Sequence, residues 1–171
     1  HPLTKELWFS DNGRDWMGDD LPPDELNHAP SQALHFGFPY LHGVGVLDPE
    51  FGEYAQTDEY TRPALELGAH VAPLGMVFYT GKQFPARYRN SIFIAEHGSW
   101  NRSTKSGYRV ISVKLYGSKP ESVEPFITGW LDEDEQSSWG RPVDVINLPD
   151  GSILVSDDYA DAIYRITYST H

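Results

Sequence analysis

The sequence predicts an all-β protein made of repeated antiparallel β-sheet units, of the kind that form the blades of a β-propeller. Aromatic residues make up 13% of the chain, which also has 15 Gly and 13 Pro. A composition so rich in aromatic and turn-forming residues favours β-structure over a helical bundle. In addition, three segments resemble one another, and each is a short apolar run that ends in an acidic residue before a polar turn.

The three similar segments are Glu6–Asp11, Ser91–Glu96 and Ser152–Asp157. An apolar run of this length reads as a strand that is buried on both faces. The acid and the polar turn that follow it would then stand at the end of the strand. Each segment is therefore predicted to deliver polar groups to one end of a sheet.

Further strand candidates flank the second and third segments. Residues 75–79 and 143–147 precede them, and the alternating stretches 108–113 and 163–168 follow. Leu148-Pro149-Asp150-Gly151 is predicted to form a turn, because Pro fixes φ near the value that a turn needs and Gly accepts a positive φ. Strand, turn and strand repeated in this way are typical of propeller blades.

The chain is predicted to be one domain, residues 1–171, containing about three blades. A propeller needs roughly four to eight blades to close, so we expect either a missing N-terminal segment or another chain to complete the ring. A β-sandwich is the structural alternative. Residues 15–70 are expected to form a long, ordered, decorated loop, because their aromatic content exceeds that of a disordered linker.

Composition excludes several classes of function. The net charge of −12 disfavours nucleic acid and anionic membranes as partners, and no apolar run reaches the roughly 18 residues of a membrane helix. The absence of Cys excludes disulfides and thiolate metal sites. Neither a glycine-rich nucleotide loop nor a Gly-x-Ser-x-Gly elbow occurs. A glycosidase stays possible, since two opposed carboxylates would suffice.

Three polar stretches could carry chemistry. Asp11–Asn27 is rich in carboxylates and suits calcium, although a solvated acidic loop is the alternative. Glu96–Arg102 follows a predicted strand and combines His, Trp, Asn and Arg, so it indicates a site more than a structural loop. In Ser138–Asp144, Arg could grip a carboxylate and Trp could stack on a flat ligand. The alternative there is a buried Arg141–Asp144 pair beside a core Trp.

Taken together, these stretches resemble a known family. The segments 11–15, 23–27, 36–40, 72–76 and 97–102 are similar to the soluble glucose/sorbosone dehydrogenases. These are sugar dehydrogenases that depend on pyrroloquinoline quinone (PQQ) and have a six-bladed propeller. The L-sorbosone dehydrogenase-like branch is the most similar, and the chain would correspond to its C-terminal portion.

The resemblance implies that the complete protein oxidises a sugar or aldose with PQQ and calcium, and that this chain alone is inactive. The implied PQQ contacts are His97, Asn101, Trp139, Arg141 and Arg14. The implied calcium sites use backbone carbonyls of Gly13 and Arg14, and a second, structural ion near Asp24 and Glu25.

The sequence departs from the family in two respects. The catalytic general base of the family is a His on an earlier blade, so no His of this chain is assigned that role. The second Arg of the glucose dehydrogenases is also absent, because Pro142-Val143 follows Arg141. A non-catalytic ligand-binding propeller is therefore kept as the alternative function. The resemblance implies a periplasmic or extracellular location and a small-molecule sugar as partner, while the electron acceptor stays unassigned.

Overall fold

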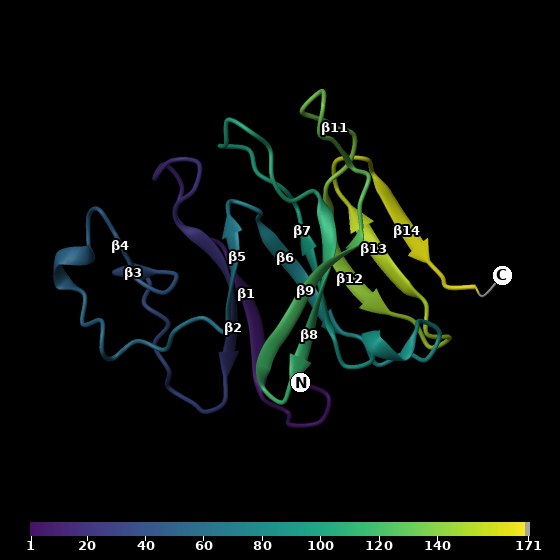
Figure 1. Cartoon of the computed structure of the whole chain (residues 1–171), viewed down its shortest axis with the longest axis horizontal. Coiled ribbons are helices and arrows are strands. Elements are labelled where there is room, and N and C mark those ends of the chain that lie inside the picture. Colours follow the sequence, from purple (N-terminus) through teal and green to yellow (C-terminus); the bar gives the residue numbers. More distant parts are fainter. Residues whose placement is uncertain (170–171) are drawn as a thin grey trace.

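The computed structural model describes residues 1–169, which form three main antiparallel sheets with two small hairpins (Figure 1). The first sheet has the order β1-β2-β5, the second β6-β7-β8-β9 and the third β12-β13-β14. Their strands are β1 (Leu7–Asp11), β2 (Pro23–Ala29), β5 (Leu65–Ala69), β6 (Pro73–Phe78), β7 (Ile92–Glu96), β8 (Arg109–Tyr116), β9 (Lys119–Ile127), β12 (Pro142–Asn147), β13 (Ile153–Asp157) and β14 (Ala162–Ile166). The all-β prediction is confirmed.

The three similar sequence segments occupy equivalent strands, namely β1, β7 and β13. In the second and third sheets the acidic residue that ends the strand pairs with the first residue of the following strand: Glu96 with Arg109, and Asp157 with Ala162. In the first sheet Asp11 pairs with Glu25, which is the third residue of β2. The second and third sheets thus repeat one pattern of strands, as is typical of propeller blades. The first sheet has no counterpart of β6 and β12 within the part of the chain that the structure describes.

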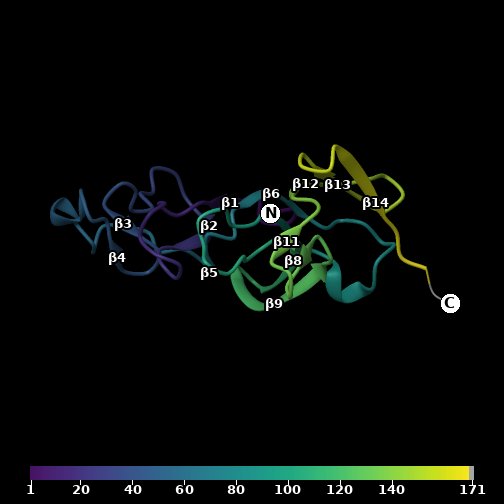
Figure 2. The ribbon, with the colours of Figure 1, turned by 90° about the horizontal axis from the view of Figure 1, so that it is seen from above.

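Neighbouring sheets approach most closely through their first strands. β12 packs against β6 and β7, and β6 packs against β1, so the sheets stand beside one another along the molecule (Figure 2). Gly75 of β6 faces Asp144 of β12, and a Cβ atom at Gly75 would overlap with the Asp144 carboxylate and Cα. Glycine is needed here because the two backbones are too close for any side chain.

The two hydrophobic cores share strand β7, all five residues of which are buried. Ile92 and Ile94 belong to the core between the first and second sheets, which also contains Trp8. Phe93 and Ala95 belong to the core between the second and third sheets. Because successive strand residues point to opposite faces, a continuously apolar strand can serve both cores.

The prediction of a long loop over residues 15–70 is wrong in part. β2 and β5 lie within this range and form two of the three strands of the first sheet. Between them the chain forms the hairpin β3 (Leu41–His42) and β4 (Val46–Leu47) and the 3₁₀ turn η1 (Gly52–Tyr54). The sequence of β2 is Pro-Asp-Glu-Leu-Asn-His-Ala, which has low intrinsic strand propensity. Pairing with β1 and β5 overrides that propensity.

Strand β9 also escaped prediction, because it has two Pro and several charged residues and is largely exposed. Such a composition is typical of an edge strand, where unpaired backbone groups must not attract another chain. The hairpin of β10 (Leu131–Asp132) and β11 (Ser137–Ser138) follows it. The helical segments of residues 1–169, η1 and η2 (Ala86–Tyr88), are single turns, and neither could cross a membrane.

Candidate functional site

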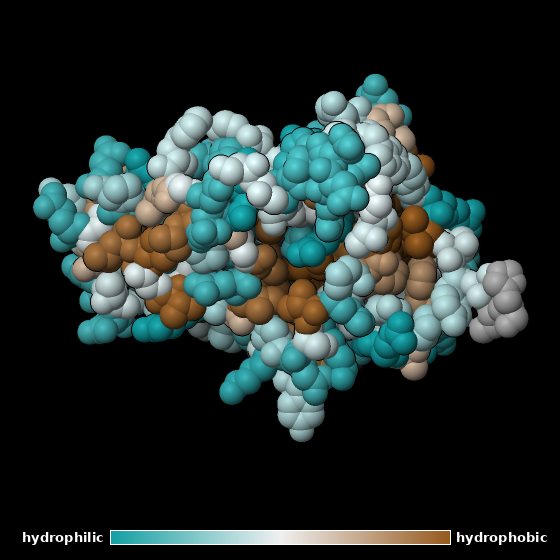
Figure 3. All heavy atoms as spheres, turned by 45° about the horizontal axis from the view of Figure 1, so that its top comes forward, coloured by the Kyte–Doolittle hydropathy of each residue, from teal (hydrophilic) through white to brown (hydrophobic). Residues whose placement is uncertain are grey.

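The ends of β1, β7 and β13 bring three loops to the same end of the sheets (Figure 1). Figure 3 turns this end forward and shows hydrophilic residues over the loops, with apolar residues exposed in the recess below them. The polar stretches that the sequence singled out therefore lie on one side of the molecule. Their side chains meet in two places, around Arg141 and around Asn101.

Arg141 connects the third sheet to the loop after β7. Its Nε donates to the carbonyl of His97 at 3.1 Å, and a second guanidinium nitrogen donates to the carbonyl of Gly98. Its backbone N–H donates to Asp157 at 2.9 Å, and the guanidinium carbon lies 5.5 Å from the centre of the Tyr108 ring. Arg141 is thus held in a fixed orientation. The Arg141–Asp144 ion pair considered from the sequence is not formed within residues 1–169.

The backbone at Gly98 is shaped by this packing. Gly98 has a φ of 98°, and a Cβ atom there would overlap with the ring of Tyr108. The Tyr108 hydroxyl in turn donates to the carbonyl of Ser99. Only glycine permits both the positive φ and the close approach, so Gly98 lets the loop turn back over Tyr108.

His97 and Trp139 take up different positions at this end. The Nε2 atom of His97 lies 2.8 Å from a carboxylate oxygen of Asp158, which links the second and third sheets again. Trp139 is 55% exposed, and its indole N–H donates to the carbonyl of Gly129 at 2.6 Å. Trp139 packs beside Trp130, with ring centroids 6.3 Å apart. Its flat face is therefore available, whereas its N–H is occupied.

Asn101 links the loop after β7 to the loop after β1. Its side-chain N–H donates to Asp15 at 2.8 Å, and its buried Oδ1 has no partner within residues 1–169. A pocket of about 220 Å³ opens here. Its walls are Asn12, Gly13, Asp15, Asp24, His70, Ala72, Trp100 and Asn101. The structure thus joins the first and second polar stretches of the sequence around one pocket.

Asp24 is the buried acid of this pocket. Its carboxylate accepts the backbone N–H groups of Gly13 and Ala72, each at 2.7 Å. Burial disfavours the charge more strongly than these bonds favour it, and it raises the pKa of Asp24 to about 6. Burial also raises the pKa of Glu96, against the effect of Arg109 at 2.6 Å, and the charge of Asp24 adds to the rise.

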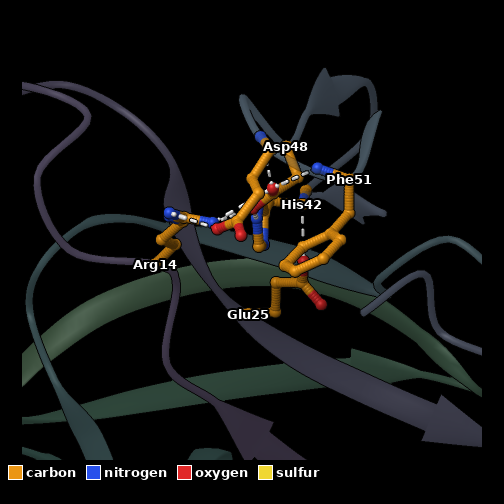
Figure 4. Close-up of polar contacts among 7 residues, drawn as sticks. Arg14, Glu25, His42, Asp48 and Phe51 are labelled. Carbon is orange, nitrogen blue, oxygen red and sulfur yellow. Dashed lines mark hydrogen bonds and ion pairs between the residues drawn. The ribbon is translucent and has the colours of Figure 1, made fainter. Parts of the chain in front are cut away.

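Glu25 and Arg14 belong to a separate cluster beside the insertion, the name used here for residues 30–64 between β2 and β5 (Figure 4). Glu25 accepts bonds from the Gly43 backbone N–H at 2.6 Å and from the Asn27 side chain at 2.9 Å. Arg14 donates from Nη1 to both carboxylate oxygens of Asp48, at 3.0 and 2.8 Å. The Arg14 side chain therefore does not meet His97 or Arg141, with which the sequence grouped it.

Asp48 is the centre of that cluster. It also accepts bonds from His42 at 3.0 Å and from the backbone N–H groups of Glu50 and Phe51, each at 2.8 Å. Burial opposes its ionisation, but the bonds from His42, the backbone N–H groups and Arg14 together hold the pKa of Asp48 well below its usual value. The cluster fixes the insertion to the first sheet.

The side chains do not fit a calcium ion shared by Asp24 and Glu25. The two residues are consecutive on β2, and successive strand side chains point to opposite faces. Both carboxylates already accept N–H donors, whereas calcium needs six to eight oxygen ligands. In residues 1–169, no three His, Cys, Asp or Glu side chains are grouped so as to hold a metal ion.

The residues that the family resemblance implies as PQQ contacts fit a flat, acidic ligand only in part. The unpartnered oxygen of Asn101 and the exposed face of Trp139 are suitable contacts. Arg141, however, already donates hydrogen bonds from two guanidinium nitrogens to backbone carbonyls. The guanidinium has five N–H donors, so three are left for a ligand carboxylate, and those on Nη1 and Nη2 are the ones that could hold it.

Some residues of the site were not identified from the sequence. His70 lines the pocket and lies 2.9 Å from the carbonyl of Gly18 through its Nε2, and Tyr108 supports Arg141. His70 was expected only as the last residue of the long loop, and Tyr108 only as the first residue of a strand. His70 has a positive φ of 60°, a conformation that sequence patterns do not reveal. From the sequence, Asp158 was predicted only as part of the polar turn after residues 152–157.

Comparisons with known proteins agree with the fold. The chain is 46% identical over 174 residues to an uncharacterized protein of Borreliella burgdorferi, covering 98% of this chain and 45% of that protein. It is 31% identical over 123 residues to a pyrroloquinoline quinone-dependent pyranose dehydrogenase of Coprinopsis cinerea, covering 61% of this chain and 16% of that protein. The chain thus spans less than half the length of these relatives.

Solved structures show the same architecture. A Trichoderma reesei structure of Carbohydrate-Active Enzymes Family AA12 superposes with a TM-score of 0.76 at 20% identity, over 96% of this chain and 50% of that one. A glucose dehydrogenase gives a TM-score of 0.72 at 24% identity, over 99% and 42%. At these identities the likeness shows the fold, which confirms the propeller. The family model described as TrAA12-like matches residues 49–169, and the chain belongs to this TrAA12-like family.

Proposed function

We propose that this chain supplies part of the cofactor site of a sugar oxidoreductase that uses PQQ. The observation that carries the proposal is the meeting of the loop after β7 with the third sheet, where Arg141 bonds to the backbone of His97 and Gly98. The similarity to a PQQ-dependent pyranose dehydrogenase supports it. We further propose an aldose or sorbosone as substrate, and the electron acceptor stays unassigned.

Each residue of the site would have a limited task. When bound, PQQ would accept the two electrons removed from the sugar. Arg141 would present positive charge beside a carboxylate of the cofactor, and the face of Trp139 would stack against a flat ring. His97 and Asn101 would orient the ligand through hydrogen bonds. No residue of this chain is assigned to removing the sugar proton, so the general base is proposed to come from elsewhere in the protein.

Calcium is proposed only at the turn after β1, through backbone carbonyls of Gly13 and Arg14. Carbonyl oxygens are suitable ligands for this ion, and the Gly13 N–H is held by Asp24 at 2.7 Å, which fixes the turn. Asp24 and Glu25 are left out of this proposal for the reasons given above. A periplasmic or extracellular location, and additional strands that complete the ring, are part of the same proposal.

The test is a PQQ-dependent rise in melting temperature, measured on the full chain with calcium present. The Arg141→Gln variant is compared with the matched control Arg165→Gln, because Arg165 pairs with Asp150 on β14 and lies outside the site. We expect PQQ to raise the melting temperature of the wild type and of Arg165→Gln but not of Arg141→Gln. Dye reduction by an aldose panel, measured on the complete protein with the strands that close the ring, would add support. Equal shifts in all three proteins, or none in the wild type, would overturn the proposal.

The second candidate is a ligand-binding propeller without catalysis. The observation in its favour is that Arg141 already uses two of its five N–H donors to join the third sheet to the loop after β7, a role that it could have without any cofactor. It predicts that the protein binds a small sugar but shows no PQQ-dependent shift.

A further inference from the structure

Two tryptophan side chains stand exposed at the mouth of the 220 Å³ pocket. Trp100 lines the pocket, and Trp16 lies against it edge to face, with ring centroids 5.3 Å apart and planes at 82°. Trp16 is 81% exposed and Trp100 is 61% exposed. Leaving two such large apolar side chains in water costs stability. Their exposure therefore does not help the chain to fold, and we look for a role in binding.

The loops hold this pair in place. Trp16 has a φ of 68°, which is an uncommon and strained conformation for a bulky residue. The loop after β1 is tied to the loop after β7 on either side of the pair. Asp15 accepts the bond from Asn101 at 2.8 Å, and the Asp19 carboxylate accepts the backbone N–H of Ser103 at 3.1 Å. The exposed indoles therefore sit on an ordered support, and their exposure is built into the fold.

Polar groups converge directly beside the pair. Asp15 and Asn101 offer carboxylate and amide oxygens, and the buried Oδ1 of Asn101 has no partner in the described part of the chain. A buried carbonyl oxygen without a donor carries a desolvation penalty that a ligand hydroxyl would relieve. Asp24 adds a second carboxylate to the lining of the pocket. The pocket thus presents hydrogen-bond acceptors beneath an apolar rim.

This combination has a definite chemical counterpart. A pyranose ring has an apolar face of C–H groups and an equatorial rim of hydroxyl groups that donate hydrogen bonds. The flat, apolar face of an indole covers the first, and the oxygens of Asp15 and Asn101 accept from the second. The volume is below the roughly 300–1,000 Å³ typical of sites for drug-sized ligands, so it suits one small ring better than a three-ring quinone.

We propose that Trp16 and Trp100, with Asp15 and Asn101, form a binding site for a single pyranose ring. The inference deepens the proposed function by naming the residues that hold the sugar, and it rests on that function only for the role of the sugar as substrate. Neither tryptophan belongs to the proposed PQQ contacts. Asn101 is shared with the proposed PQQ contacts, so the tryptophans are the residues that distinguish the sugar site from the cofactor site.

The experiment measures binding of methyl β-D-glucopyranoside to the full chain without quinone, by saturation-transfer NMR with a titration for the Kd. This probe has its C1 oxygen blocked and cannot be oxidised there, so binding is read apart from turnover. Trp16→Ala and Trp100→Ala are compared with Tyr116→Ala. Tyr116 is 80% exposed and is the last residue of β8, where it pairs with Lys119. Because β8 is antiparallel to β7, this end of the sheet is opposite the loop after β7 (Figure 1).

We expect each Trp variant to raise the Kd by about five- to tenfold, the loss of one aromatic contact, while Tyr116→Ala leaves it unchanged. Because all three residues are exposed, unfolding is checked by melting temperature, which should stay near that of the wild type. No binding by the wild type, or equal Kd values for the Trp variants and the wild type, would overturn the inference.

The PQQ shift separates this inference from the proposed function. If the PQQ-dependent shift is absent but sugar binds through the tryptophans, the inference holds and the quinone proposal fails. If the PQQ-dependent shift is present but the Trp variants bind sugar as the wild type does, the quinone proposal holds and the inference fails. The shift itself should be the same in Trp16→Ala as in the wild type.

Discussion

Tyr79 provides a sharp test of how the second and third sheets are held together. The side chain is fully buried in the core between them. Its hydroxyl donates to the carbonyl of Gly151 at 2.7 Å, in the turn between β12 and β13. The same hydroxyl accepts the backbone N–H groups of Gln83 at 3.1 Å and Phe84 at 3.0 Å. The Tyr79→Phe variant would remove one oxygen and leave three backbone groups without it.

The expected cost follows from those three groups. Leaving a buried polar group unsatisfied costs about 1–3 kcal/mol, and partial access of water to Gln83 reduces the sum, so we expect Tyr79→Phe to lose about 2–4 kcal/mol of unfolding free energy. For a chain of this size, 1 kcal/mol corresponds to roughly 2–4 °C in melting temperature. The variant should therefore melt roughly 4–16 °C below the wild type, as measured by circular dichroism.

Tyr88→Phe is the matched control. Tyr88 lies in the same core, but its hydroxyl is bonded to Arg87 at 3.0 Å. Arg87 is exposed and can turn to water, so this variant should lose only about 1 kcal/mol or less. If Tyr79→Phe melts no lower than Tyr88→Phe, the hydroxyl does not connect the sheets as described and the reasoning is refuted.

Two further predictions concern Asp24 and Gly75. Burial raises the pKa of Asp24 to about 6, so the folded protein holds the proton of this carboxyl more tightly than the unfolded chain does. The stabilisation that results is fully present below about pH 4 and is lost as the pH rises through about 6. The loss is on the order of 3 kcal/mol. Denaturation of the wild type and Asp24→Asn at several pH values between 4 and 7 should show their difference in unfolding free energy changing by this amount, and a constant difference would contradict the argument. Gly75→Ala should destabilise the fold by about 1–3 kcal/mol, because its methyl group would overlap with Asp144. Gly45→Ala, where a Cβ meets nothing within 4 Å, should change the melting temperature little, and equal effects of the two would rule out the close approach of β6 and β12.

The sequence predicted those strands whose own residues carry the signal. β7 is apolar up to its final Glu and is buried at every position between two cores, and β13 begins with three apolar residues, of which Ile153 and Val155 are buried in one core. β2 and β9 escaped prediction because their residues are polar, charged or Pro. They are strands because neighbouring strands satisfy their backbone hydrogen-bonding groups, and the local strand propensity of their own residues does not predict such pairing.

The candidate site shows the same division. The sequence identified His97, Asn101 and Arg141 as residues in loops at strand ends, and the structure places these loops at one end of the sheets. It could not show that Arg141 would bond to the backbone of residues 97 and 98, or that Asn101 would bond to Asp15. It also grouped Arg14 with these residues, whereas the Arg14 side chain turns to Asp48 in the insertion.

The sequence by itself determined the repeated strands, the acidic residues that end them and therefore the end of the molecule at which polar loops gather. These features depend on near neighbours along the chain, since burial and turn formation follow from the alternation of residues and from Gly and Pro. Only the tertiary structure decided that Asp24 lines the pocket while Glu25 faces the insertion, and that Trp16 meets Trp100. The physical reason is that these choices depend on the face of a strand and on bonds between residues distant in sequence, which are fixed when the sheets pack together.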